Sequence, residues 1–343
     1  ILANCTWTAP TDGRIVNPGH TPCNNTVMQY QGITVLPTSF DDWYDLVQSL
    51  VQHAVDIFGT AEVEKWTFEV CKFHPICHKS IYMFLSICFY DSSFFPSLTD
   101  NLFLFASFFS LAFHAGNELW GIDNITPQYM SLYNASALAV KSVSTTFHIG
   151  GPATARLQYV TEFVHQATAM NLPFDFVSTH MYPTDPQCPT GKDWGPDCLP
   201  RNVRALKENL LNIPSFKKSN VPLYLTEYNA GCGVGYPQHD TSGAAAFAFR
   251  TIGELEGTVG LLSWWTFSDI FEENTAIEKH TEYMNVYGLM TKSGIPKPSW
   301  RAFQLLHELA GTTRLNTTVT AVDAVTAVQQ EKHVLTSSDC TIE

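Results

Sequence analysis

The segment Phe174-Asp175-Phe176-Val177 is apolar at three of its four positions and leads into the polar residues Ser178-Thr179-His180. A second segment, Leu261-Leu262-Ser263-Trp264-Trp265, has the same near-continuous apolar character. Strands with this pattern are buried on both faces, which is typical of a parallel sheet covered by helices. Both segments are therefore predicted to be strands of such a sheet.

Amphipathic segments alternate with short apolar segments along most of the chain. The clearest helix spans 38–59, where apolar side chains recur with helical spacing, Thr38 or Ser39 is the cap and Gly59 is the end. Further helices are predicted at about 127–142, 155–170, 201–212, 241–256 and 298–309, and strands at 65–70, 147–152, 174–182, 222–228 and 260–268. This alternation predicts an α/β fold, and its spacing favours a (β/α)8 TIM barrel over an open sheet.

Composition and charge argue against some classes of binding partner. Of 343 residues, 45% are hydrophobic and 15% are charged, which is enough apolar material for a large core. A net charge of −13 and the lack of any Lys/Arg-rich run argue against nucleic acid and against an anionic membrane surface. The expected partner is neutral, and the sequence does not indicate an oligomeric state.

Glycosylation sequons and cysteines indicate the compartment. Five sequons suggest a glycoprotein that is secreted or extracellular, or else lysosomal or vacuolar, at Asn4, Asn24, Asn124, Asn134 and Asn316. In that setting the chain's nine cysteines can form disulfides, and the short separations make Cys188–Cys198 and Cys5–Cys23 candidate pairs.

One stretch, 71–116, breaks the β/α alternation. It holds ten of the chain's 23 Phe, seven Ser and no Glu or Arg. Its two apolar runs, 81–90 and 102–113, are each too short to span a membrane, although an anchored apolar hairpin stays an alternative. A zinc site is disfavoured because the spacing matches no standard module for Cys71, His74, Cys77 and His78.

Polar groups that could cleave a sugar follow three apolar segments. Glu118 follows Asn117, His180 and Tyr182 end a second segment, and Glu227 ends a third. The carboxyl ends of parallel barrel strands open on one face, so these groups can meet. Glycoside hydrolysis needs one carboxylic acid for the leaving oxygen and one carboxylate at the anomeric carbon. A lone glutamate at a strand end is more often a solvated rim residue, but two in this setting favour catalysis.

Side chains near the last strand extend the prediction. Trp264 and Trp265 face opposite ways on a strand, so we assign Trp265 to the pocket and Trp264 to packing between the barrel and a helix. Glu272 is the weakest candidate, because Glu272 and Glu273 also fit an exposed acidic pair. Asp269 fits a residue that braces the loop carrying them.

Several motifs, in this order, resemble the signature of glycoside hydrolase family 39. They are Trp66-Thr67-Phe68-Glu69-Val70, Asn117-Glu118, Gly150-Gly151-Pro152-Ala153-Thr154-Ala155, Ser178-Thr179-His180-Met181-Tyr182-Pro183-Thr184-Asp185, Leu225-Thr226-Glu227-Tyr228-Asn229, Trp265-Thr266-Phe267-Ser268-Asp269-Ile270-Phe271-Glu272-Glu273 and Gly294-Ile295-Pro296-Lys297-Pro298. The resemblance runs from about 32 to 311 apart from 71–116, and is closer to β-xylosidases than to α-L-iduronidases.

The resemblance implies a retaining exo-glycosidase that hydrolyses β-glycosidic bonds, first of all β-xylosides. Glu118 would be the general acid/base after strand 4, and Glu227 the nucleophile after strand 7. Asn117 would hydrogen-bond the sugar 2-hydroxyl. The −1 subsite would be lined by His180, Tyr182, Trp265 and Glu272. The implied substrate is an oligosaccharide or other glycoside, and no metal or cofactor is implied.

Two departures from the family pattern qualify this reading. The first is that 71–116 separates Val70 from Asn117, where the family runs directly into the acid/base. We interpret 71–116 as the translation of a retained intron, because pyrimidine-rich DNA encodes the Phe, Ser and Leu that dominate it. Excision of this stretch can restore a Trp codon at the junction and leaves an even number of cysteines. The alternative interpretation is a genuine loop. The second is that about 65 residues precede Trp66, too few for the strands expected there. Strands 1 and 2 are thus expected to be absent.

The predicted organisation is a partial (β/α)8 catalytic domain at 1–310 and the start of a β module or a tail at 311–343. Alternative functions remain: a non-catalytic sugar-binding barrel, an inactive fragment of the enzyme, or an enzyme acting on α-L-iduronides or other glycosides.

Overall fold

The structure, a computed structural model, describes residues 37, 39–70, 84–90, 107–113, 127–188, 197–232, 235–270 and 282–309, with the backbone alone at 84–90 and 107–113. Its strands are β1 (Thr67–Val70), β2 (Phe84–Tyr90), β3 (Ser107–Phe113), β4 (His148–Thr154), β5 (Phe176–His180), β6 (Leu223–Tyr228) and β7 (Leu261–Trp264). Its helices are α1 (Phe40–Phe58), α2 (Thr60–Val63), α3 (Pro127–Val143), the 3-10 helix η4 (Ala155–Leu157), α4 (Val160–Ala169), α5 (Cys198–Leu211), α6 (Pro214–Ser219), α7 (Ser242–Leu255) and α8 (Pro298–Glu308).

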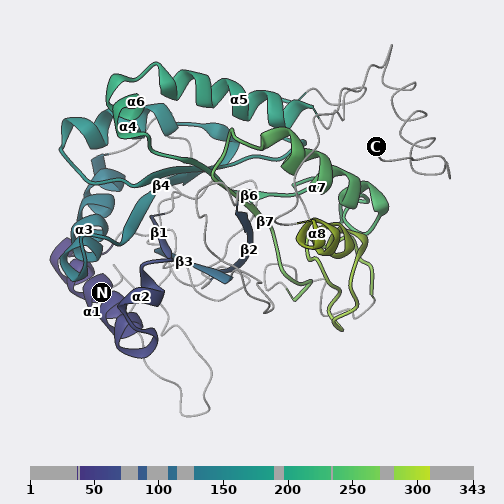
Figure 1. Ribbon diagram of the computed structural model, residues 1–343, viewed down its shortest axis with the longest axis horizontal. Coiled ribbons are helices and arrows are strands. Elements are labelled where there is room, and N and C mark those ends of the chain that lie inside the picture. The colour runs from purple at the N-terminus through teal and green to yellow at the C-terminus, as the bar shows by residue number, and fades with distance from the viewer. Residues whose placement is uncertain are drawn as a thin grey trace, which may run out of the picture. The chain divides into compact units, whose positions relative to one another are not determined.

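Five strands form a parallel half-barrel. Each of the neighbours in the order β1-β4-β5-β6-β7 pairs in parallel. The helices lie outside these strands (Figure 1). Because all five strands run the same way, their carboxyl ends meet at one edge, and His180 lies in register with Glu227 across β5 and β6.

The predicted (β/α)8 barrel is therefore confirmed only as a partial barrel. Two strands within the Phe/Ser-rich stretch, β2 and β3, complete a closed ring of seven. β3 pairs in parallel with β1, but β2 runs antiparallel to both β3 and β7, a direction that a (β/α)8 barrel does not contain. The physical reason is backbone pairing: the half-barrel ends in β1 and β7, whose outer hydrogen-bonding groups need partners.

The first predicted helix is confirmed as α1. Ser39 caps it, since its hydroxyl accepts a hydrogen bond from the Asp42 N–H at 3.1 Å, and Gly59 ends it with a positive φ of 82°. Its buried face packs against α3, where the Trp43 indole N–H donates to Ser136 Oγ at 2.9 Å. This buried hydrogen bond fixes how α1 lies on the half-barrel.

The helix predicted at 155–170 is wrong as a single element. Arg156, Leu157 and Tyr159 adopt positive φ values of 60–61°, which end the helical path and divide it into η4 and α4. The short helix α6 was not predicted. Its Pro214 stands at the first helical position, where proline's fixed φ is favourable.

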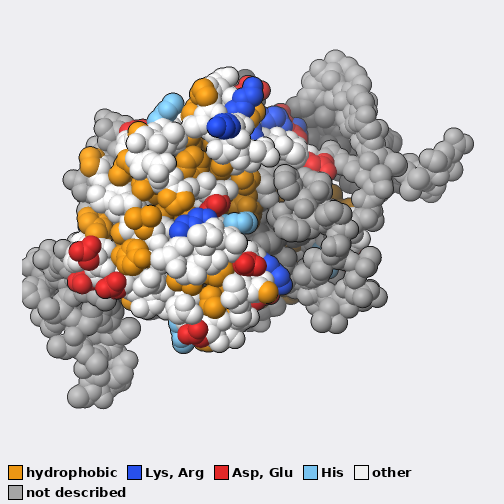
Figure 2. All heavy atoms as spheres, turned by 60° about the vertical axis from the view of Figure 1, so that its left-hand side comes forward, with side chains coloured by type: hydrophobic (Ala, Val, Ile, Leu, Met, Phe, Trp, Pro, Cys, Tyr) orange, Lys and Arg blue, Asp and Glu red, His pale blue; other side chains and the backbone are white. Residues whose placement is uncertain are grey.

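A disulfide and an apolar outer surface complete the description of the fold. The predicted Cys188–Cys198 disulfide is confirmed, and it ties the segment after β5 to the start of α5; Cys5 and Cys23 lie outside the described residues. Large apolar side chains such as Leu46 and Leu138 are exposed on the outer helices, and Figure 2 shows hydrophobic side chains gathered on one face. In the described part of the chain, no helix is long and apolar enough to cross a membrane.

Candidate active site

The carboxyl ends of β5 and β6 bring three predicted site residues together around one carboxyl group. Glu227 is only 3% exposed. The Tyr182 hydroxyl donates a hydrogen bond to Glu227 Oε1, and His180 Nδ1 lies 3.2 Å from Glu227 Oε2. Both carboxyl oxygens of Glu227 therefore have a polar partner within the site.

Burial dominates the electrostatics of this carboxyl. Removal from water disfavours the carboxylate and raises the pKa of Glu227 to about 8. The hydrogen bond from Tyr182 acts in the opposite direction, whereas the negative charges of Glu69 and Asp185 raise the pKa further. Burial, followed by the Glu227 charge, also raises the pKa of Tyr182 well above its ordinary value, so its hydroxyl keeps the proton that it donates.

The two adjacent tryptophans at the end of β7 pack in different environments. The Trp264 ring packs edge-on against Phe303 of α8, with ring centroids 5.5 Å apart. Trp265 instead belongs to a small buried apolar cluster with Tyr182, Val286 and Tyr287. This cluster lies beside the carboxyl group of Glu227, because Tyr182 contacts that carboxyl directly.

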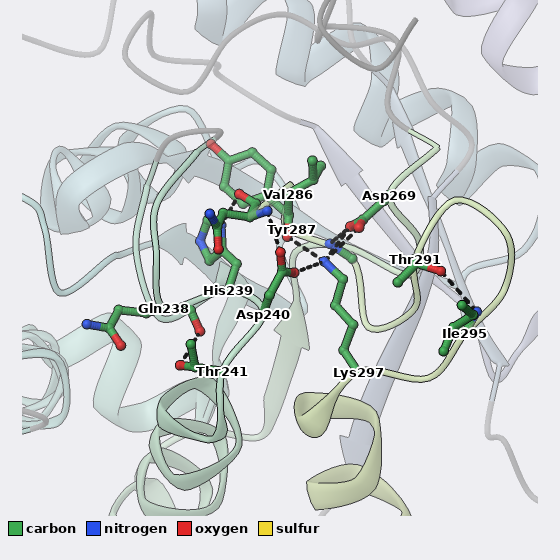
Figure 3. A network of polar contacts seen from close by, with 12 residues as sticks. Gln238, His239, Asp240, Thr241, Asp269, Val286, Tyr287, Thr291, Ile295 and Lys297 are labelled. Carbon is green, nitrogen blue, oxygen red and sulfur yellow. Dashed lines mark hydrogen bonds and ion pairs between the residues drawn. The ribbon is translucent and has the colours of Figure 1, made fainter. Parts of the chain in front are cut away.

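A buried charge network joins the segments that follow β6 and β7 (Figure 3). The Lys297 side chain is fully buried, and its Nζ lies 2.5 Å from Asp240 Oδ1 and 2.7 Å from Asp269 Oδ2. The same ammonium donates to the Val286 carbonyl oxygen at 2.9 Å. Since an isolated buried charge is very unfavourable, the lysine and the two aspartates depend on one another.

The two aspartates of this network also hold the backbone beside the apolar cluster. Asp240 accepts a hydrogen bond from the Asn285 N–H, and Asp269 Oδ1 accepts one from the Gly288 N–H at 2.8 Å. His239 Nδ1 lies 2.9 Å from the Asn285 carbonyl oxygen. Asp269 thus holds the backbone at Gly288, and the segment 285–288 is fixed at several consecutive backbone groups. The predicted brace for the residues that carry Glu272 and Glu273 lies outside the described residues.

Backbone pairing across the same loop continues this arrangement. The Asn229 amide donates to the carbonyl oxygens of Trp265 and Tyr287. The Leu289 N–H donates to the Thr266 carbonyl oxygen at 3.0 Å, and the Thr266 N–H donates to that of Tyr287 at 3.3 Å. The chain before and after 271–281 is therefore paired to itself next to the site.

Sequence reasoning missed these supporting residues. Lys297 and Asp185 stand inside motifs quoted above, but nothing in their local spacing indicates that Lys297 meets Asp240. No sequence pattern indicated that Tyr287 lies at the site, since an isolated tyrosine in a Gly-containing segment is common.

Three predicted site residues, Asn117, Glu118 and Glu272, lie outside the described residues. Their roles, and those of His180, Tyr182, Glu227 and Trp265, remain predictions. Among the described residues, no three His, Cys, Asp or Glu side chains gather in a way that could hold a metal ion.

Two curated β-xylosidases are similar to this chain. That of Caldicellulosiruptor saccharolyticus is 31% identical over 287 residues, which is 83% of this chain and 50% of the relative. That of Geobacillus stearothermophilus is 27% identical over 298 residues, again 50% of the relative. The chain thus spans about half the length of the curated relatives it matches.

Solved structures agree in fold. A monomeric β-xylosidase from Caulobacter crescentus CB15 is 25% identical with a TM-score of 0.58, covering 84% of this chain and 50% of that one. The GH39 enzyme from Xanthomonas axonopodis pv. citri, 24% identical, has a TM-score of 0.61 and covers 85% and 49%.

The family model described as glycosyl hydrolases family 39 matches residues 117–340, well over half of the chain. The motif order, the partial barrel and the buried Glu227 at a strand end agree with this match. The chain belongs to glycoside hydrolase family 39.

Proposed function

We propose that this protein is a retaining exo-glycosidase that hydrolyses β-xylosides by two successive displacements. The observation that carries the proposal is the setting of Glu227, buried at the carboxyl end of β6 between the Tyr182 hydroxyl and the His180 imidazole. Family membership and the similarity to two β-xylosidases support the substrate class. Because the chain covers half of these relatives, its own activity is part of the proposal.

Before the first step Glu227 must lose the proton that burial favours, because only its carboxylate is a nucleophile. A carboxylate oxygen of Glu227 then attacks the anomeric carbon while Glu118 donates its proton to the leaving glycosidic oxygen. The carbon–oxygen bond breaks and a glycosyl ester forms on Glu227. In the second step Glu118, now a carboxylate, takes a proton from water, which attacks the same carbon and releases Glu227. Tyr182 can hold the carboxyl oxygen that does not attack. Asn117, His180, Trp265 and Glu272 complete the proposed substrate site.

Azide rescue separates the two glutamates. Glu227→Ala should lose nearly all turnover of 4-nitrophenyl β-D-xyloside, and added azide should restore it with formation of the α-glycosyl azide, since only one displacement occurs. Glu118→Ala should give the β-glycosyl azide, because the ester on Glu227 still forms first. NMR of the anomeric proton distinguishes the products.

Glu62 of α2, which is partly exposed and pairs with Lys65, supplies a control. Glu62→Ala should leave turnover unchanged. Full turnover by Glu227→Ala without azide would refute the assigned nucleophile. A folded wild-type chain that binds xylose without cleaving xylosides, glucosides, galactosides, arabinosides or α-L-iduronides would instead indicate a sugar-binding barrel or an inactive fragment.

We also propose that the protein works in a secretory or extracellular compartment. The Cys188–Cys198 disulfide supports this, because such bonds persist in oxidising surroundings. The five sequons add to it. Expression through a secretory pathway followed by enzymatic deglycosylation should lower the intact mass; an unchanged mass at all five asparagines would count against it.

A further inference from the structure

A tight turn follows β5 and begins at the residue that contacts Glu227. The Tyr182 N–H donates to Asp185 Oδ2 at 2.8 Å, and the Asp185 N–H donates back to the Tyr182 carbonyl oxygen at 3.1 Å. Asp185 is only 5% exposed. One buried carboxylate thus fixes the backbone of the tyrosine whose hydroxyl reaches Glu227.

This turn is anchored to its surroundings on several sides. Arg156 Nε, in η4, lies 3.8 Å from Asp185 Oδ1. The Cys188 N–H donates to the Asp185 carbonyl oxygen at 2.8 Å, and Cys188 is joined by its disulfide to α5. Thr184 Oγ1 accepts from the N–H of Cys232, after β6, at 2.8 Å. Since the rest of the turn is fixed, the Tyr182 backbone has little freedom once Asp185 accepts its N–H.

We propose that Asp185 is a positioning residue for Glu227, which holds the Tyr182 hydroxyl on the Glu227 carboxyl and places a second negative charge near it. A role of Asp185 in catalysis rests on the proposed function, whereas its effect on the Tyr182–Glu227 contact does not. No site prediction from the sequence included Asp185.

Asp185 has two opposite effects on Glu227. Its charge raises the pKa of Glu227, while the Tyr182 hydrogen bond that it supports lowers that pKa. Among the described residues, the other titratable groups that act on Asp185, Tyr182 or Glu227 are Arg156, His180, Glu69 and Tyr287. Substitutions at Asp185 leave those groups in place, so they can separate the two effects.

A carboxyl ¹³C NMR titration of the full chain, labelled at glutamate, measures the pKa of Glu227, whose resonance is assigned by its loss in Glu227→Gln. Asp185→Asn removes the charge but keeps an oxygen that can accept the Tyr182 N–H, so the pKa of Glu227 should fall. Asp185→Ala also removes the acceptor. We expect its Glu227 pKa to be about one unit higher than in Asp185→Asn, as befits a hydrogen bond to a charged group.

Combining each Asp185 variant with Tyr182→Phe tests whether Asp185 acts on the pKa of Glu227 through the Tyr182 hydroxyl. Without the Tyr182 hydroxyl, Asp185→Asn and Asp185→Ala should give the same Glu227 pKa. Equal values with Tyr182 present, or a difference that survives Tyr182→Phe, would overturn the proposal. If the alanine variant fails to fold, Asp185→Leu, similar in volume and also without an acceptor, replaces it.

Asp175 provides a matched control at the other end of β5. Its Oδ2 also accepts a backbone N–H, from Ile149 at 2.9 Å, and also pairs with a cation, Lys141, at 2.9 Å. Asp175→Asn should leave the Glu227 pKa unchanged. Because the titration needs no turnover, an inactive chain with the expected pattern would refute the proposed function alone, and an active chain without it would refute this inference alone.

Discussion

Replacing Glu227 by glutamine is expected to stabilise the chain at high pH and to change its stability little at low pH. Burial raises the Glu227 pKa from 4.5 to about 8, so the folded chain keeps a proton that the unfolded chain releases. The unfolded state therefore binds fewer protons in this window, and the free energy of unfolding falls as pH rises through it. Glutamine does not titrate, and its carboxamide oxygen can still accept the Tyr182 hydroxyl.

The magnitude follows from the width of this window. Each pH unit between the two pKa values is worth about 1.4 kcal/mol. From about pH 5 to about pH 8, the wild-type chain should therefore lose about 4 kcal/mol of unfolding free energy relative to Glu227→Gln.

Urea unfolding of both chains at four pH values in this range measures the difference. Asp185 and Asp269, whose pKa values burial also raises, titrate in both chains, so their contributions cancel to first order. A difference between the two chains that stays constant across the range would refute the reasoning.

Three further perturbations test the supports of the fold. Lys297→Met leaves two buried carboxylates without their cation, so urea unfolding should show a loss of about 3–5 kcal/mol, whereas Lys65→Met, at an exposed pair, should cost less than about 1 kcal/mol; equal losses would contradict the network. Replacing Cys188 and Cys198 by serine removes the disulfide that joins them and should cost about 2–3 kcal/mol, seen as a lower Tm in the absence of reductant. Trp43→Phe removes the buried hydrogen bond to α3 and should cost about 1–3 kcal/mol, so an unchanged Tm would argue against that contact.

The parallel strands and most helices could be predicted from the sequence because their signals are local. β5 and β6 begin with apolar residues and carry polar ones toward their carboxyl ends, and α1 has a capping serine, helical apolar spacing and a terminal glycine. The ring could not be predicted, because nothing in the composition of 71–116 indicates that β2 pairs with β7, more than 170 residues away. Such pairing depends on which sheet edges need partners, and that is a property of the assembled fold.

The candidate site likewise contains residues that could be predicted from the sequence and residues that could not. Glu227, His180 and Tyr182 stand at or just after strand ends, so the parallel geometry alone was enough to predict that they meet. The residues that support them act across loops: Lys297 contacts Asp269 over a separation of 28 residues. Periodicity cannot show such contacts, because loop conformation decides them.

The hydrogen-bonded segments on either side of 271–281 suggest that this stretch can be replaced by another sequence. Thr266 and Leu289 are hydrogen-bonded to each other, and Asp269 holds Gly288, so the chain on both sides of 271–281 is anchored by residues outside that stretch. Lengthening a loop with fixed ends adds little closure entropy. Segments of other lengths grafted between these anchors, with Glu272 retained, should therefore leave the position of Glu227 undisturbed.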